Sequence, residues 1–218
     1  MARRVLALFA KAPVPGFAKT RLAPPLTPER AAAFYEAMLL DILDQHASVS
    51  DCELALWFTP DGAAEWFAAH APAVYRRLPQ RGRDLAERMR ELFRFHAAEG
   101  CERIVLRGTD SPTLPAARVA QAFAALEHSP LVLCPDRDGG YNLIGARAPH
   151  DALFELALSR SDVLGATLAR ARELGLPCEI LPAHHDVDTW QDVVRLSAEL
   201  DPARTPRTLA LQRELMAR

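Results

Sequence analysis

Three positively charged side chains near the N-terminus are spaced so that a single anion could contact all of them. Lys11, Lys19 and Arg21 lie in a segment that Pro13 and Pro15 stiffen. Cationic side chains and backbone N–H groups of such loops converge on phosphate in many proteins. The segment therefore predicts a phosphate-binding loop. The alternative is an ordinary surface loop whose three cations are solvated.

Patterns on both sides of this loop favour the phosphate site. The apolar run 5–9 predicts a short buried strand, and residues 27–29 (Thr-Pro-Glu) predict the start of a helix. A Walker A loop is excluded, because Pro13 and Ala18 stand where its glycines belong. No Gly-x-Gly-x-x-Gly occurs, which argues against a dinucleotide-binding loop of that type. The candidate phosphate-binding residues of the loop are Lys11, Pro15, Gly16, Lys19, Thr20 and Arg21.

Carboxylates form the second candidate group, and they come directly after predicted strands. Asp110 follows the run 104–106, Asp136 and Asp138 follow 131–133, and Asp186 and Asp188 follow 180–181. Carboxylates gathered at one sheet edge repel one another unless a cation lies among them. Hard oxygen ligands suit Mg²⁺ or Mn²⁺ together with substrate phosphates. The alternative is that Asp110 and Asp188 only cap the helices that follow them.

Other catalytic chemistries find less support in the sequence. Residues 186–188 (Asp-Val-Asp) resemble an aspartyl-phosphate motif, but that motif usually opens its domain, and Trp190 stands where Thr or Val is expected. His184 and His185 could join a metal site, act as a base, or be surface histidines. No Gly-x-Ser-x-Gly elbow is present. Gly139-Gly140 permits close backbone approach to a ligand, or simply a tight turn.

Composition limits the class of protein. The 218 residues suffice for one sizeable core, and half of them are hydrophobic. A net charge of -2 argues against wrapping of nucleic acid. The four cysteines form no Cys-x-x-Cys pair and are typical of reduced core residues. The apolar stretch after the N-terminal arginines is too short for a signal peptide, and no run reaches membrane-spanning length. We therefore expect a cytoplasmic protein.

Strand and helix patterns alternate along the chain and predict a three-layer α/β/α sandwich with a mostly parallel (mixed) sheet. An apolar stripe predicts a helix over residues 28–47, and the pattern Asp84-Leu85-Ala86-Glu87 resembles a capping box that opens another. Ser161 and Thr189 are predicted to cap later helices. The other predicted strands are 54–58, 74–78, 141–144 and 179–181, and the other predicted helices are 115–128 and a tail that begins near residue 206.

Five motifs together resemble a known family. They are K-A-P-x-P-G-x-x-K-T-R-L at 11–22, R-G-R-D-L-A-E-R-M at 81–89, G-T-D-S-P-T-L at 108–114, D-G-G-Y-N-L-I-G at 138–145 and D-V-D-T at 186–189. The chain is similar over residues 4–195 to the small bacterial GT-A-like proteins described as nucleotide-diphospho-sugar transferases or glycosyltransferases. The resemblance implies a single GT-A-like domain over 1–218, with a helical tail over 200–218.

The resemblance also implies a metal site. In the GT-A superfold a divalent cation bridges nucleotide phosphates to an Asp after the fourth strand. The matching residue is Asp110, with Asp186 or Asp188 completing the site. The usual Asp-x-Asp of glycosyltransferases is absent from 108–112, where only its last Asp remains. Residues 19–24 (Lys-Thr-Arg-Leu-Ala-Pro) are also similar to the loop of phospholactate guanylyltransferases, so nucleotidyl transfer stays possible.

The leading hypothesis is a metal-assisted transferase that uses a nucleotide-activated donor, most simply a nucleotide sugar. Asp110, Asp188 and Lys19 are the candidate catalytic residues, and Asp110, Asp186 and Asp188 are the candidate ligands of Mg²⁺ or Mn²⁺. Asp84 joins the phosphate-binding loop, and Asp138, Gly139, Gly140 and Tyr141 border the acceptor. The alternatives are a nucleotidyltransferase and a non-catalytic nucleotide-binding protein. The expected partners are the donor and a small-molecule acceptor, with no nucleic acid, and the sequence specifies no oligomeric state.

Overall fold

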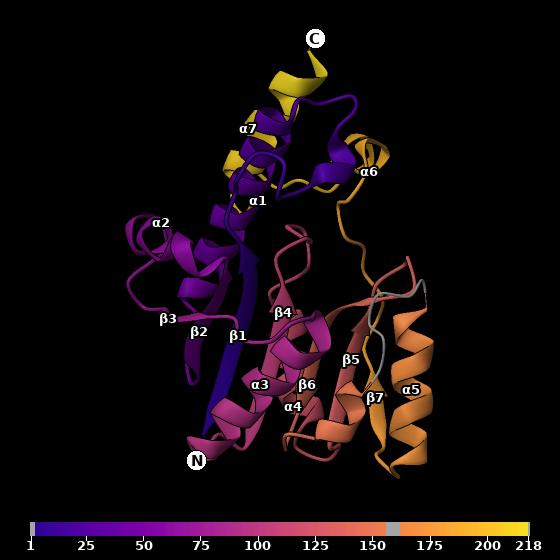
Figure 1. Cartoon of the computed structure of the whole chain (residues 1–218). Coiled ribbons are helices and arrows are strands. Elements are labelled where there is room, and N and C mark those ends of the chain that lie inside the picture. Colours follow the sequence, from indigo (N-terminus) through magenta and orange to yellow (C-terminus); the bar gives the residue numbers. More distant parts are fainter. Residues whose placement is uncertain (1–2, 156–161, 218) are drawn as a thin grey trace.

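The computed structural model describes residues 3–155 and 162–217 (Figure 1). Its strands form one 7-stranded sheet in the order β3-β2-β1-β4-β6-β5-β7. Strand β6 runs antiparallel to both of its neighbours, and every other pairing in this sheet is parallel. The strands are β1 Arg4–Lys11, β2 Glu53–Thr59, β3 Arg76–Pro79, β4 Arg103–Gly108, β5 Leu131–Pro135, β6 Tyr141–Ala146 and β7 Cys178–Ile180. The predicted mixed, mostly parallel sheet is confirmed.

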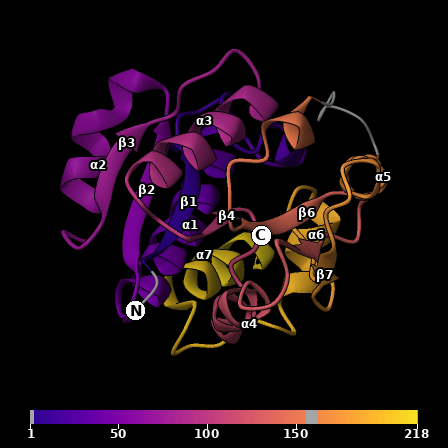
Figure 2. The ribbon, with the colours of Figure 1, turned by 90° about the horizontal axis from the view of Figure 1, so that it is seen from below.

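Helices cover both faces of this sheet, as Figure 2 shows from below. One apolar core joins α1, α2 and α4 to the sheet, and a second core joins α3 and α5 to its other face. The predicted three-layer sandwich is therefore confirmed. The helices are α1 Pro28–Ala47, α2 Ala64–His70, α3 Leu85–Ala98, α4 Ala117–Ala125, α5 Val163–Glu173, α6 Trp190–Leu196 and α7 Pro206–Met216. Among the described helices, none is long and apolar enough to cross a bilayer.

The C-terminal helix packs on the outer side of α1. A third apolar cluster joins Phe34 and Met38 of α1 to α6 and α7. The carboxylate of Asp41, which is buried, accepts hydrogen bonds from the backbone N–H and the hydroxyl of Thr208, both at 2.8 Å. Because an unpaired buried carboxylate is costly, these bonds fix α7 to α1. The predicted tail is thus part of the packed structure.

Helix starts follow the capping rules with some differences from expectation. Thr189 and Asp192 form a full capping box at α6, as expected for Thr189. At α3 the Asp84 carboxylate accepts from the Glu87 N–H, but the Glu87 carboxylate turns to the N–H of Arg83 instead. The prediction for Ser161 falls outside the described residues, and Asp162 is the residue that caps α5.

Candidate active site

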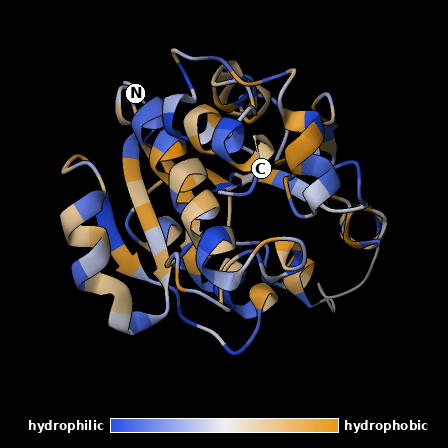
Figure 3. Ribbon diagram, turned by 90° about the horizontal axis from the view of Figure 1, so that it is seen from above, coloured by the Kyte–Doolittle hydropathy of each residue, from blue (hydrophilic) through white to orange (hydrophobic). Residues whose placement is uncertain are grey.

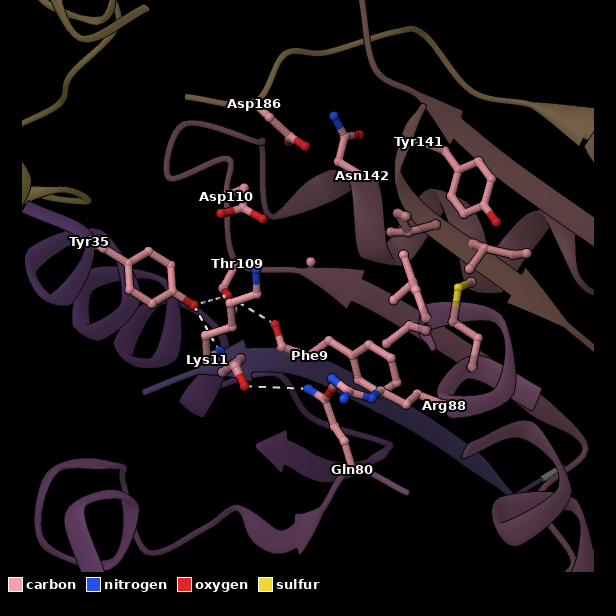
Figure 4. Close-up of a pocket in the computed structure, with 17 residues that line it drawn as sticks. Phe9, Lys11, Tyr35, Gln80, Arg88, Thr109, Asp110, Tyr141, Asn142 and Asp186 are labelled. Atoms are coloured by element: carbon pink, nitrogen blue, oxygen red, sulfur yellow. Dashed lines mark hydrogen bonds between the residues drawn. The ribbon is translucent and has the colours of Figure 1, made fainter. Parts of the chain in front are cut away.

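A cavity of about 420 Å³ lies over the carboxyl ends of β1 and β4 (Figure 4). Open sheets of this kind place ligands at this edge. Figure 3 shows the molecule from above, with hydrophilic and hydrophobic residues alternating along its helices. One part of the cavity wall is apolar and includes Phe9, Leu85 and Met89. Polar groups reach the cavity from several segments of the chain. The polar lining residues are Lys11, Tyr35, Gln80, Arg88, Thr109, Asp110, Tyr141, Asn142 and Asp186.

Lys19 lies between two of the predicted carboxylates. Its ammonium donates to Asp188 at 2.8 Å and forms an ion pair with Asp110. The Lys19 side chain is 4% exposed, whereas Asp110 and Asp188 keep 45% and 36% of their side-chain surface. The ammonium is therefore covered, and the carboxylates can still accept a ligand from the open side. Burial alone would lower the pKa of Lys19, but the two carboxylates raise it above its ordinary value.

The backbone of the N-terminal loop positions this cation. Lys19 has a left-handed backbone (φ 49°) and precedes a 3₁₀ turn over Thr20–Leu22. A left-handed backbone is uncommon for a non-glycine residue and often marks a functional loop. The turn folds the loop over a second cavity of about 240 Å³, which Lys11, Lys19, Thr20, Arg21, Asp110 and Asp188 line with Phe17, Ala18 and Tyr35. Pro15 and Gly16 are exposed and line neither of the two cavities described.

The pKa of Asp110 reflects this pairing. Desolvation by the surrounding loops favours the neutral acid, but the Lys19 ammonium outweighs it and holds the pKa below its ordinary value. Asp188 also accepts from Arg21 at 3.3 Å. The cationic loop and the post-strand carboxylates, which are far apart in the sequence, therefore meet in one place. Such a site can neutralise phosphate oxygens and hold a divalent cation beside them.

Asp186 has the opposite electrostatic character. Burial and the negative charge of Asp110 raise its pKa to about 7. The Ser111 hydroxyl donates to its carboxylate, and its backbone N–H donates to Asp136 at 3.1 Å. Asp186 is therefore half protonated near neutral pH, and a cation beside it would displace that proton.

Metal binding fits the donor set only in part. The carboxylate oxygens of Asp110, Asp186 and Asp188 suit Mg²⁺ or Mn²⁺. In the described part of the chain, however, these three do not form a group whose ligand atoms all lie within 4.8 Å of one another. The residues fit a cation held by one or two carboxylates and completed by substrate phosphates, which is the usual arrangement for Mg²⁺.

Histidines 184 and 185 lie beside this site rather than in it. His184 Nε2 is 3.1 Å from the Thr113 hydroxyl, and His185 Nε2 is 3.5 Å from the Glu199 carboxylate. Neither histidine lines the two cavities described. Burial lowers the pKa of His184 to about 4, with a contribution from His185, so His184 is neutral at pH 7. These contacts connect the 182–188 segment to the end of α6.

The helix-cap explanation of the acidic residues is wrong. Helix α4 has Ala116 at its N-cap, and α6 has Thr189. Neither Asp110 nor Asp188 therefore caps the following helix, and both carboxylates turn instead toward Lys19.

A row of hydrogen bonds through two hydroxyl groups fixes the end of β1, and the sequence did not indicate it. The Lys11 N–H donates to the Tyr35 hydroxyl at 3.1 Å, and the hydroxyls of Tyr35 and Thr109 are 2.8 Å apart. Thr109 donates in turn to the Phe9 carbonyl, as the dashed lines of Figure 4 trace. These hydrogen bonds therefore connect Lys11 through Tyr35 to Thr109, the neighbour of Asp110. In the sequence Tyr35 belongs to the apolar stripe of its helix, which hides this role.

Gln80 and Arg88 close the end of the cavity that lies away from Asp186 (Figure 4). Gln80 donates to the carbonyls of Ala10 and Trp57 at 3.3 and 2.9 Å, which fixes its side chain at the end of β3. Arg88 donates to the Gly82 carbonyl at 3.1 Å. Asp84, predicted to contact phosphate, caps α3 and lines neither of the two cavities described. The motif at 81–89 thus lies next to the cavity, and Arg88 and Met89 are among its lining residues.

The predicted acceptor turn contributes less than expected. Of its four residues, Tyr141 lines the cavity, whereas Asp138, Gly139 and Gly140 do not among the described lining residues. The Gly139 carbonyl instead accepts from Leu164 at 2.8 Å, which connects the turn to α5. Asn142, whose sequence context did not mark it as a site residue, lines the cavity and is 4% exposed. Its amide oxygen and nitrogen have no hydrogen-bond partner among the described residues, at a cost of about 1–3 kcal/mol.

The sheet order and the helices on both faces give the chain a nucleotide-diphospho-sugar transferase-like fold. A candidate nucleotide-diphospho-sugar transferase from Desulfovibrio desulfuricans G20 is 32% identical, with a TM-score of 0.89 over 100% of this chain and 96% of that one. A cytidylyltransferase from Leptospira borgpetersenii serovar Hardjo-bovis (strain JB197) shares the fold at 11% identity, with a TM-score of 0.59 over 100% and 95% of the two chains.

The sequence comparisons name the family. Residues 42–158 match the family described as "Uncharacterized protein conserved in bacteria (DUF2064)". A 3-phospho-D-glycerate guanylyltransferase from Phenylobacterium zucineum (strain HLK1) is 34% identical over 206 residues, which cover 88% of this chain and 90% of that protein. The chain belongs to the DUF2064 family.

Proposed function

We propose that this protein is a metal-assisted nucleotidyltransferase that transfers a nucleoside monophosphate from a triphosphate to the phosphate of a small acceptor. The observation that carries the proposal is the convergence of Lys11, Lys19 and Arg21 with Asp110 and Asp188 around one cavity. The guanylyltransferase relative, which matches most of both chains, supports nucleotidyl transfer and favours GTP as the donor.

In the proposed reaction an acceptor phosphate oxygen attacks the α-phosphorus of the triphosphate. The bond between the α-phosphorus and the oxygen that bridges to the β-phosphorus breaks, and pyrophosphate leaves with that electron pair. Lys11, Lys19 and Arg21 stabilise the charge that develops on the leaving group. Asp110 and Asp188 are the residues that would hold Mg²⁺ or Mn²⁺, which supplies further charge neutralisation on the phosphates when bound.

The remaining cavity provides room for the base. Phe9, Leu85 and Met89 offer apolar surface, and Arg88 lies beside them. A base that lay against this surface would place its triphosphate toward Lys11 at the end of β1. Gln80 is already bonded to two carbonyls and therefore acts as a rigid wall at this end.

Glycosyl transfer from a nucleotide sugar is the second candidate. The Desulfovibrio protein supports it, because it is named for this chemistry and is similar over nearly the whole chain. In that reaction Lys19 and Arg21 would stabilise a departing nucleoside diphosphate in the same place. A non-catalytic nucleotide-binding protein is the third possibility, and the same assay tests it.

A donor screen distinguishes these functions. Each nucleoside triphosphate is incubated with 3-phospho-D-glycerate and Mg²⁺ or Mn²⁺, and pyrophosphate release is measured. Nucleotide sugars are tested in parallel for release of nucleoside diphosphate. We expect pyrophosphate from GTP that depends on both metal and acceptor and that Asp110→Asn removes, whereas the control Asp61→Ala retains it. Turnover of a nucleotide sugar alone would contradict nucleotidyl transfer, and calorimetric binding without any turnover would indicate the non-catalytic function.

A further inference from the structure

Asn142 is the single asparagine of the chain, and its position in the sheet is irregular. Along the pairing of β5 with β6, Cys134 is opposite Leu143 and the next residue, Pro135, is opposite Tyr141. Asn142 is therefore the extra residue of a bulge. Bulges often re-aim a side chain next to an active site. In Figure 4 Asn142 lies in the cavity wall between Tyr141 and Asp186.

The amide of Asn142 has hydrogen-bonding capacity that the described residues leave unused. Both atoms of its amide are covered and lack a hydrogen-bond partner among the described residues. Most buried amides are bonded, so an unpaired amide at a cavity wall needs another explanation. A substrate group that reached the amide from the cavity would supply the two missing hydrogen bonds.

We propose, on the basis of the nucleotidyltransferase function above, that Asn142 binds a hydroxyl group of the acceptor and selects phosphorylated hydroxy acids over analogues that lack the hydroxyl. The amide offers one donor and one acceptor next to each other, and a hydroxyl group satisfies both. A carboxylate could satisfy only the amide N–H, and it would face the carboxylate of Asp186. Asn142 is on β6, two strands away from the phosphate-binding end of β1, so the group it reads belongs to the acceptor side.

The first test uses the intact protein and one NMR signal. Asparagine labelled with ¹⁵N at the side-chain amide gives a single NH₂ pair, because the chain has one asparagine. We expect 3-phospho-D-glycerate to shift this pair in the presence of a non-hydrolysable GTP analogue and Mg²⁺. We expect 3-phosphopropionate, which lacks the hydroxyl, to shift it much less. A shift caused by the GTP analogue alone, or no shift with either acceptor, would overturn the proposal.

The second test measures acceptor preference. We expect the wild type to prefer 3-phospho-D-glycerate over 3-phosphopropionate by at least about thirtyfold in kcat/KM, and Asn142→Leu to reduce this ratio to about threefold or less. The ratio of GTP to ITP, measured in the same variants, is the internal control and should not change. A changed GTP to ITP ratio with an unchanged acceptor ratio would show that Asn142 reads the base and would overturn the proposal.

The melting temperature separates binding from a structural role. Because Leu has the same number of side-chain heavy atoms in the same branched arrangement and no polar atoms, Asn142→Leu should keep or raise the melting temperature, whereas loss of a structural hydrogen bond would lower it. Failure of the proposed nucleotidyltransferase function would be seen in a different measurement. In that case no triphosphate would release pyrophosphate with any acceptor, whether or not the Asn142 amide signal shifts.

Discussion

The ammonium of Lys19 donates a hydrogen bond of 2.8 Å to the carboxylate of Asp188, across a sequence separation of 169 residues. The same ammonium is paired with Asp110. The cation of the predicted phosphate loop thus occupies the space between two candidate metal ligands. A divalent cation and Lys19 would therefore compete for these carboxylates.

Replacement of Lys19 should separate metal binding from phosphate binding. In Lys19→Met the two carboxylates lose their internal cation, so Mn²⁺ alone should bind about tenfold more tightly. The affinity for a triphosphate without metal should fall, because one phosphate-binding cation is gone. Mn²⁺ electron paramagnetic resonance and calorimetry measure the two effects. Lys11→Met is the matched control: it should weaken triphosphate binding without tightening Mn²⁺, and equal Mn²⁺ affinity in all three proteins would contradict the competition.

Replacement of Asp110 should remove metal-dependent nucleotide binding. In Asp110→Ala we expect the affinity for GTP with Mg²⁺ to fall by more than about tenfold, with little change in affinity without Mg²⁺. Because ionised Asp110 is stabilised by Lys19, the variant should also lose on the order of 1 kcal/mol of stability. Calorimetry and thermal unfolding measure both. Asp61→Ala, a change of an exposed acid outside both cavities, is the control, and unchanged Mg²⁺ dependence in Asp110→Ala would exclude Asp110 as a ligand.

Asp186 should make metal binding depend on pH. Its raised pKa of about 7 means that a proton competes with the cation below neutrality. We expect the affinity for Mn²⁺ in the presence of nucleotide to fall by about tenfold per pH unit below pH 7 and to level off above it. A pH-independent affinity between pH 5.5 and 8 would contradict this assignment.

The same raised pKa predicts an effect on stability. The folded protein binds the Asp186 proton more tightly than the unfolded chain does, so this residue progressively destabilises the fold as the pH rises from about 4 to 7. Asp186→Asn, which cannot ionise, should therefore raise the melting temperature at pH 8 more than at pH 5. Equal shifts at the two pH values would show that Asp186 is ionised throughout.

His46 should determine part of the acid sensitivity. It is fully buried, and Arg107 donates to its Nε2 at 2.9 Å while its Nδ1 lies 3.0 Å from the Ile42 carbonyl. Burial, and then the Arg107 charge, lower its pKa to about 3. The unfolded chain takes up this proton first, so stability is lost as the pH falls from about 6.5 toward 3. We expect a loss on the order of 2 kcal/mol by pH 4.5.

Substitution of His46 tests this assignment. His46→Gln keeps a side-chain acceptor for Arg107 and cannot be protonated, so the difference in unfolding free energy between pH 7 and pH 4.5 should shrink. His128→Gln, a change of a histidine that keeps 69% of its side-chain surface exposed, should leave this difference as in the wild type. An equal loss in all three proteins would assign the acid sensitivity to other groups.

Much of the fold, and the meeting of the cationic loop with the carboxylates, could be predicted from the sequence, because the signals are local. Apolar runs of five residues and a capped amphipathic helix indicate β1, β2 and α1 directly. Lys19, Asp110 and Asp188 could be brought together because strand ends meet at one edge of a parallel sheet. The sequence could not predict that Lys19 pairs with both carboxylates, because this pairing depends on the left-handed backbone at Lys19. The roles of these residues and the single domain stay predictions.

The residues that sequence reasoning missed share a physical cause. Tyr35 is part of an apolar helix stripe, Gln80 follows a short strand, and Asn142 lies inside an apolar strand pattern. Each of these residues carries a polar group but lies in an apolar stretch of sequence. The hydrophobic periodicity of that stretch assigns the residue to the core. Only the three-dimensional structure reveals that Tyr35 and Gln80 are bonded across segments and that Asn142 belongs to a bulge.

The antiparallel direction of β6 affects how the sequence of such a protein can evolve. The strands β1 and β4 bring their last residues to the cavity, whereas antiparallel β6 brings its first residues, Tyr141 and Asn142. The proposed acceptor wall and the proposed phosphate-binding loop are therefore encoded in separate, short stretches of the gene. Substitutions at two adjacent codons could exchange one acceptor for another while the donor chemistry stays intact. A fold built in this way can diversify its products in small steps.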